Sequence, residues 1–218
     1  MARIRYTPIR ILRYFPPNDE LAVKVARLCI LVEDFILESR GVSGESLPIL
    51  DELSPEWRKI YFLRNSIGTI HEIRVAIDDI RLNPTFKDYF DKQSTEEKNQ
   101  FDKKFKALKA EEKTLKKIRN DMGGAHVLTE AVKIGLGNLD PSEEGFVQAG
   151  GTLKNSHLKF VHKIVSGYLA SQILEDGSHA SVEEMKHFFE RIIKTSSAAA
   201  ALVMIILGIF FKERNLFP

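Results

Sequence analysis

The sequence has few of the residues that build covalent or metal cross-links. It contains one cysteine, Cys29, in 218 residues, so neither an internal disulfide nor a cysteine-rich zinc site can form. Cys29 falls in an apolar helical pattern, and we interpret it as a small core residue rather than a nucleophile. No His, Asp and Glu residues cluster at metal-ligand spacing, and no Gly-x(4)-Gly-Lys phosphate loop is present. We therefore expect no metal and no cofactor.

A strong net charge is also missing. The 32 Lys and Arg residues nearly balance the 30 Asp and Glu residues, which leaves a formal net charge of +2. Any affinity for nucleic acid must then come from a local basic patch. The first 14 residues contain no long apolar region of the kind found in signal peptides, so we expect a cytoplasmic protein.

Helical periodicity dominates the rest of the chain and predicts an all-α fold. We expect residues 1–17 to form an N-terminal arm and residues 18–218 to form a single helical domain. Apolar spacings of three and four predict a helix over 19–39, ended by Gly41. A second helix should run from 55 to about 82, where an Asn-Pro pair stops it.

Two capping boxes predict the starts of later helices, Ser94 to Glu97 and Ser181 to Glu184. The helix after the first box should lead straight into residues 118–127. Between the two boxes we expect a small β-hairpin near 146–157, with residues 152–153 as its second strand.

The last helix is unusually apolar, with 17 uncharged residues between Lys194 and Lys212. This length is at the short limit for crossing a bilayer, so a tail anchor is one interpretation. The other is a helix that is apolar all round because it is buried in the core or in a dimer interface. Its alanine-rich half suits close helix packing, and we favour burial over membrane insertion.

The segment Ile118 to Val127 carries the most distinctive chemistry. Arg119 and His126 are seven positions apart, so on a helix both would project from the same face, with Asn120 beside the arginine. A guanidinium and an imidazole that converge can hold a phosphate and move a proton. The alternative is a helix end with a satisfied histidine and a glycine C-cap, which the spacing alone favours.

The same spacing occurs a second time, in Arg64-Asn65 and His71. His71 lies next to Ile70 in an apolar stripe and is not preceded by paired glycines. We interpret it as a boundary histidine, with a supporting role as the lesser alternative, and take the repetition as a warning about chance matches.

A basic run leads to the first of these segments. From Lys98 to Arg119 there are nine Lys and Arg residues against three acids. Such a run is most often a solvated helix face. Here it ends at a pair of residues suited to phosphate, which is the arrangement an RNA backbone needs.

The segment from Arg119 to His126 is similar to the Arg-x(4–6)-His signature of the HEPN superfamily, in which asparagine often follows the arginine. Together with Tyr61 to Ile67 it resembles a family of bacterial HEPN-like proteins, over roughly residues 19–135 and more loosely the final helix. The resemblance implies an up-down helical bundle that dimerises so that two motifs share one cleft. It also implies two kinds of member, metal-independent ribonucleases and non-catalytic binding modules.

Our first hypothesis is therefore a metal-independent endoribonuclease. His126 would act as general acid and base, Arg119 would bind the scissile phosphate, and Asn120 would orient the histidine or the phosphate. The basic residues expected to hold the RNA backbone are Lys109, Lys113, Lys116 and Lys117.

The second hypothesis is a dimeric HEPN-like module that binds a nucleotide, RNA or a protein partner such as an antitoxin, without proton transfer. A tail-anchored membrane protein is the third. Under the first two hypotheses we expect a homodimer, because one motif per chain supplies half of a shared cleft.

Overall fold

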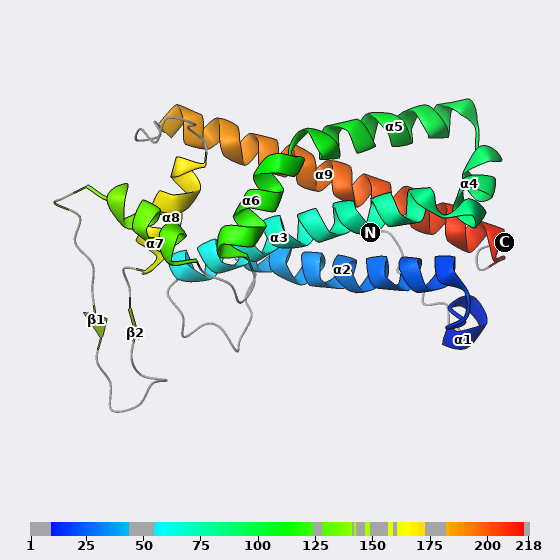
Figure 1. Ribbon diagram of the computed structural model, residues 1–218, viewed down its shortest axis with the longest axis horizontal. Helices are drawn as coiled ribbons and strands as arrows, with labels where there is room; N and C mark the ends of the chain where they lie inside the picture. The colour runs from blue at the N-terminus through cyan, green and yellow to red at the C-terminus, as the bar shows by residue number, and fades with distance from the viewer. Residues whose placement is uncertain are drawn as a thin grey trace, which may run out of the picture.

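The computed structural model describes residues 10–43, 55–123, 128–140, 142, 147–148, 157–158, 161–172 and 182–215. Its architecture is an all-α up-down bundle (Figure 1). The four longest helices are α2 (Glu20–Ser43), α3 (Pro55–Leu82), α5 (Thr95–Ala110) and α9 (Val182–Glu213). They alternate in direction along the long axis of the molecule.

Shorter elements close the two ends of the bundle (Figure 1). At one end lie α1 (Ile11–Tyr14) and α4 (Pro84–Asp91), and at the other lie α7 (Thr129–Gly137) and α8 (Val161–Ser171), while α6 (Glu112–Met122) runs from the end of α5 across α3. Phe15, from the predicted arm, stacks on Phe210 near the end of α9, with ring centroids 5.5 Å apart.

The predicted hairpin is present but its register differs from the expected one. Strand β1 (Val147–Gln148) pairs antiparallel with β2 (His157–Leu158), with Val147 opposite Leu158. The expected second strand at 152–153 is therefore wrong, because the strand that pairs with β1 begins five residues later, at His157.

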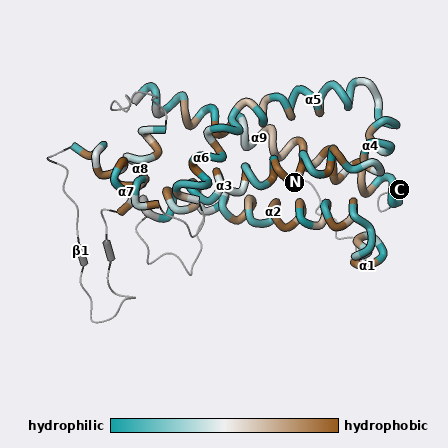
Figure 2. The backbone as a smooth tube through the Cα atoms, in the orientation of Figure 1, coloured by the Kyte–Doolittle hydropathy of each residue, from teal (hydrophilic) through white to brown (hydrophobic). Residues whose placement is uncertain are grey.

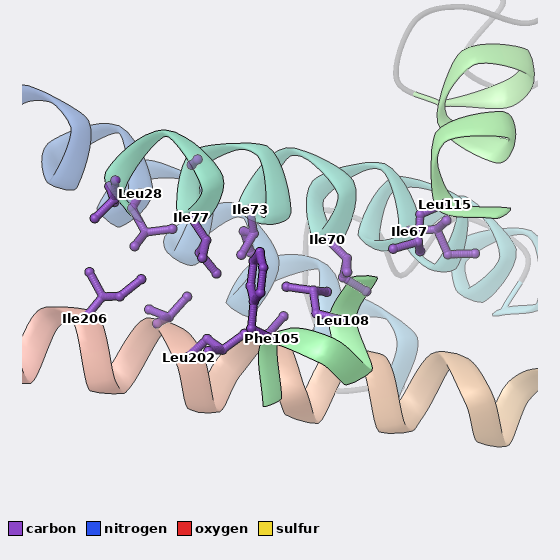
Figure 3. Packing of buried hydrophobic residues seen from close by; sticks show 14 of the residues in the cluster. Leu28, Ile67, Ile70, Ile73, Ile77, Phe105, Leu108, Leu115, Leu202 and Ile206 are labelled. Carbon is purple, nitrogen blue, oxygen red and sulfur yellow. The ribbon is translucent and has the colours of Figure 1, made fainter. Parts of the chain in front are cut away.

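The core lies between α2, α3, α5 and α9 (Figure 3). From α3 it receives the buried isoleucine stripe of Ile67, Ile70, Ile73, Ile77 and Ile80. From α5 it receives Phe105 and Leu108, and from α9 Leu202 and Ile206. Burying such a side chain is worth about 1.5–3 kcal/mol, so this stripe is what fixes the rotation of α3 and hence the direction of its polar residues.

The predicted limits of α3 are confirmed, and Asn83 caps the following α4 through a hydrogen bond that Phe86 N donates to its side chain at 3.2 Å. The capping box at Ser94 is also confirmed. The expectation that Gly41 ends the first long helix is wrong. Gly41 is buried inside α2, where the ring of Phe62 occupies the space that a side chain would need, so its small size serves helix packing. Ser181 of the other box lies outside the described residues.

The segment Lys186–Glu213 of α9 is, among the described helices, the one that length and composition would allow to cross a membrane, a test that core helices also pass. Of its most apolar window, 44% is buried against the rest of the chain. Met204 remains 69% exposed and Ile193 64% exposed on the outer side. In Figure 2 the apolar part of α9 contrasts with the largely hydrophilic α5 beside it.

Candidate nucleic-acid interface

Helix α6 carries the arginine of the candidate motif and begins at a break in the predicted long helix. Leu115, Ile118 and Met122 are buried at spacings of three and four, which turns one face of α6 toward α3. The break is at Glu111, whose φ and ψ of −99° and 6° end α5. Its carboxylate accepts two hydrogen bonds from Arg191 of α9, at 2.6 and 2.9 Å. The basic run is therefore divided between two helices.

Helix α6 ends before the candidate histidine. Gly123 follows Met122 with φ −82° and ψ 143°, an extended conformation, while its N–H still bonds to Arg119 O at 3.0 Å. The expectation that one continuous helix places Arg119 and His126 on the same face is therefore wrong, because two helical turns do not separate them. The glycine cap of the alternative interpretation is confirmed. His126 itself lies outside the described residues.

Arg119 lies across α3 and is held by two acceptors. Its Nη2 is 3.1 Å from Glu72 Oε1, and its Nη1 donates to Asn120 Oδ1 at 3.1 Å. Its Cγ passes above Gly68, where an added Cβ would lie 3.7 Å away. The side chain remains 49% exposed. Two contacts leave several of the five guanidinium N–H groups available to a ligand.

Asn120 contacts neither of the groups that it was expected to orient, the histidine or a phosphate, among the described residues. Its side chain accepts from the neighbouring arginine, so among the described residues it orients Arg119. This is compatible with phosphate binding, since the amide group stays on the exposed side of α6 beside the guanidinium.

The four predicted RNA-binding lysines, Lys109, Lys113, Lys116 and Lys117, are all exposed. None of them forms an ion pair with a described residue, although Lys109 lies over the Phe105 ring at 5.3 Å. On α6 the three later lysines share one face with Asn120, at offsets of three, four and seven. This face adjoins Arg119, so α6 presents one continuous basic surface to solvent.

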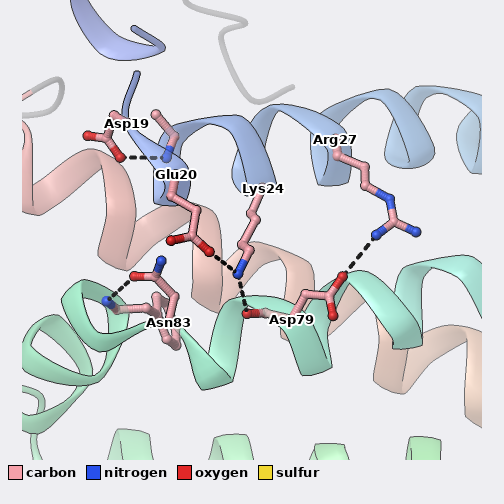
Figure 4. A network of polar contacts seen from close by, with 8 residues as sticks. Asp19, Glu20, Lys24, Arg27, Asp79 and Asn83 are labelled. Carbon is pink, nitrogen blue, oxygen red and sulfur yellow. Dashed lines mark hydrogen bonds and ion pairs between the residues drawn. The ribbon is translucent and has the colours of Figure 1, made fainter. Parts of the chain in front are cut away.

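Arg27 and Glu72 lie beside Arg119, and no pattern in the sequence pointed to either of them. Glu72 Oε2 is 3.3 Å from Arg27 Nη2. Arg27 Nη1 is 3.0 Å from Asp79 Oδ2, and in Figure 4 this Arg27–Asp79 contact continues a row of polar contacts between α2 and α3. The sequence could not identify this contact, because the partner of a charged residue on a polar helix face depends on which helices pack side by side.

The second copy of the motif is buried. Arg64 is 6% exposed and His71 is 7% exposed. Arg64 Nε and His71 Nδ1 are buried, and neither atom has a hydrogen-bond partner among the described residues. Burial lowers the pKa of His71 below its ordinary value, helped by the positive charges of Arg74 and Arg119 and opposed by Glu72 and Glu112. His71 is thus more deeply buried than the expected boundary position, and the positive charge of Arg119 contributes to its lowered pKa.

The end of α6 is anchored by a contact that the sequence did not suggest. The hydroxyl of Tyr168, a buried residue of α8, donates to Asp121 Oδ2 at 2.6 Å. Burial and this hydrogen bond both raise the pKa of Tyr168, so the phenol stays protonated as the donor. The contact fixes the last turn of α6, and with it the position of Arg119.

In the described part of the chain, no group of three His, Cys, Asp or Glu side chains is arranged to hold a metal ion. No protein-family model, curated protein or solved structure matches this chain. The site must therefore be interpreted from its own geometry.

Proposed function

We propose that the protein binds the sugar-phosphate backbone of RNA along α5 and α6 and cleaves it as a metal-independent endoribonuclease. The observation that supports this most directly is the surface on α6, where Arg119 adjoins exposed lysines that no described acid neutralises. Lysines of this kind bind phosphates by releasing counterions, and a forked guanidinium suits a single phosphate.

In the proposed reaction, Arg119 binds the scissile phosphate and stabilises the charge that develops on its oxygens. His126 removes the proton of the ribose 2′-hydroxyl, whose oxygen then attacks phosphorus. The 5′-oxygen leaves and takes up a proton from the protonated His126, which returns the imidazole to its neutral form. The products are a 2′,3′-cyclic phosphate and a 5′-hydroxyl, and no metal ion takes part.

The experiment compares wild type with His126→Ala on a fluorescent single-stranded RNA, with a chelator present. We expect wild type to produce 2′,3′-cyclic phosphate ends, and the variant to bind the RNA with nearly the same affinity without cutting it. The double charge reversal Lys116→Glu and Lys117→Glu should weaken binding and flatten its salt dependence, without a change in product ends.

A second candidate is a binding module without catalysis, and the end of α6 at Met122 favours it. Because the helix stops there, seven-residue spacing does not by itself direct an imidazole toward Arg119. If wild type binds RNA but never cuts it, and His126→Ala behaves identically, this candidate replaces the ribonuclease.

We also propose a homodimer, as the resemblance implies. Exposed Ile36 on α2 and Met204 on α9 border an apolar groove of about 330 Å³ between these helices. Exposed apolar surface of this kind is typical of a protein interface. Sedimentation should show a dimer at micromolar concentration, and Met204→Lys should weaken it; a wild-type monomer in dilute salt would contradict the proposal.

A further inference from the structure

One carboxylate bridges two arginines that come from helices far apart in the sequence. Glu72 of α3 places Oε1 3.1 Å from Nη2 of Arg119 on α6, and Oε2 3.3 Å from Nη2 of Arg27 on α2. The two arginine side chains are 49% and 44% exposed, and the Glu72 side chain is 30% exposed. The bridge is therefore open to solvent rather than sealed in the core.

Each arginine has a further partner that does not depend on Glu72. Asp79 holds Arg27 at 3.0 Å, and Asn120 holds Arg119 at 3.1 Å. The two guanidinium groups would thus keep their positions if the Glu72 carboxylate turned away. Gly68, one helical turn before Glu72, carries no side chain to fill the space beneath Arg119.

Two guanidinium groups that converge on the two oxygens of one anion also suit a phosphate, which offers oxygens with similar geometry and charge. We propose that Arg27 and Arg119 form the binding site for one phosphate group of the RNA backbone, and that the Glu72 carboxylate occupies this site in the ligand-free chain. This inference rests on the proposed function, and it adds Arg27 and Glu72 to the site.

Opposite effects of neighbouring substitutions follow from this arrangement. Glu72→Gln removes the competing charge and leaves both arginines in place, so RNA should bind more tightly. Arg27→Gln removes a phosphate ligand and also leaves Glu72 to Arg119 alone, so RNA should bind more weakly. If the three residues formed only a structural ion-pair network, both substitutions would lower stability, and RNA affinity would follow net charge alone, which the control below measures.

The test measures binding of a 2′-O-methyl RNA oligomer, which cannot be cleaved, by fluorescence anisotropy at several salt concentrations. One hydrogen bond to a charged group contributes enough binding free energy to change an affinity about tenfold. We therefore expect RNA affinity to rise about tenfold for Glu72→Gln. It should fall about tenfold for Arg27→Gln or Arg119→Gln. Arg27→Gln should also lower the salt slope by about one. Thermal melts of each variant confirm folding.

Glu111→Gln is the matched control. Glu111 accepts two hydrogen bonds from Arg191, whose side chain is 48% exposed, so this substitution releases an arginine in the same way. RNA affinity should change less than twofold. An increase equal to that of Glu72→Gln would show a general charge effect and overturn the inference.

A second measurement does not depend on RNA. Phenylglyoxal modifies accessible arginines, and mass spectrometry reports which ones react. In Glu72→Gln, inorganic phosphate should protect Arg27 and Arg119 together and leave Arg191 unprotected. If wild type fails to bind RNA but this protection is observed, the proposed function is wrong and the phosphate site remains. If RNA binds but Glu72→Gln weakens it, or phosphate gives no joint protection, the phosphate site is wrong.

Discussion

The pattern of Arg-Asn followed by a histidine occurs on α3 and again at the end of α6, and the two copies have opposite surroundings. Arg64 is 6% exposed, and its closest described partner is the ring of Tyr61, 5.4 Å from the guanidinium carbon. Arg119 has a 49% exposed side chain and two polar partners. The same local sequence thus gives a buried cation in one place and a solvent-facing one in the other.

The difference follows from how each helix is packed. Helix α3 runs through the centre of the bundle and contacts α2, α6, α8 and α9, so few of its faces reach solvent. Helix α6 packs mainly on α3 and keeps a basic face outside. A short motif can therefore indicate function only when its helix has a free face.

The largest expected effect separates the two arginines by activity. Arg119→Met should lower the rate of RNA cleavage by about 10²–10³, the usual cost of losing one donor that stabilises a transition state. Arg64→Met should leave this rate nearly unchanged. Single-turnover cleavage at saturating enzyme is the measurement, and equal losses in both variants would contradict the distinction between the copies.

The free energy of unfolding should respond to the same two substitutions in the opposite order, with the larger change at Arg64. Arg64 has no carboxylate partner among the described residues, and burial lowers its pKa. Replacing a poorly compensated buried charge with an apolar side chain of similar volume is often stabilising, so Arg64→Met should raise the free energy of unfolding by about 1 kcal/mol or more. Arg119→Met should change it by less than about 1 kcal/mol. Urea unfolding measures both free energies. A loss of stability in Arg64→Met would mean that the contact with the Tyr61 ring stabilises the fold by more than burial of the charge destabilises it.

A smaller effect concerns Glu38, which faces α3 between the positions of Arg64 and His71. Burial raises its pKa to about 7, although Thr69 Oγ1 donates a hydrogen bond to it at 3.0 Å, and Asp34 adds repulsion. The unfolded carboxyl loses its proton first, so stability should fall as pH rises from about 4.5 to about 7. Glu38→Gln should gain in melting temperature over wild type between about pH 5 and about pH 8. A constant difference would contradict the raised pKa.

The smallest expected effect is at His71. Here stability should fall as pH decreases, whereas at Glu38 it falls as pH increases. The pKa of His71 is lowered in the folded chain, so the unfolded chain takes up a proton first as pH falls below about 6.5, and stability should decline. His71→Gln cannot take up this proton. The difference in melting temperature between variant and wild type should therefore grow toward acid pH. If it is flat, His71 is better solvated than its 7% exposure indicates.

Local signals predicted much of the fold. The limits of α3 followed from an apolar stripe that ends at Asn83-Pro84, and the start of α5 followed from a capping box at Ser94. Both are interactions within a few residues, so the sequence contains all the information they require. The solvated basic face of α6 is of the same kind, because the spacing of Leu115, Ile118 and Met122 already assigns the opposite side to the core.

Contacts between distant segments decided the rest. Periodicity and charge spacing are enough to predict amphipathic helices with a basic run before an arginine-histidine motif. The packing of the bundle is what separates α5 from α6, makes Gly41 a packing residue, and buries Arg64 while Arg119 stays exposed. It also placed Arg27 and Glu72 beside Arg119. The reason is physical: helix periodicity fixes which residues share a face, whereas the partner of that face depends on how the whole bundle buries its apolar surface.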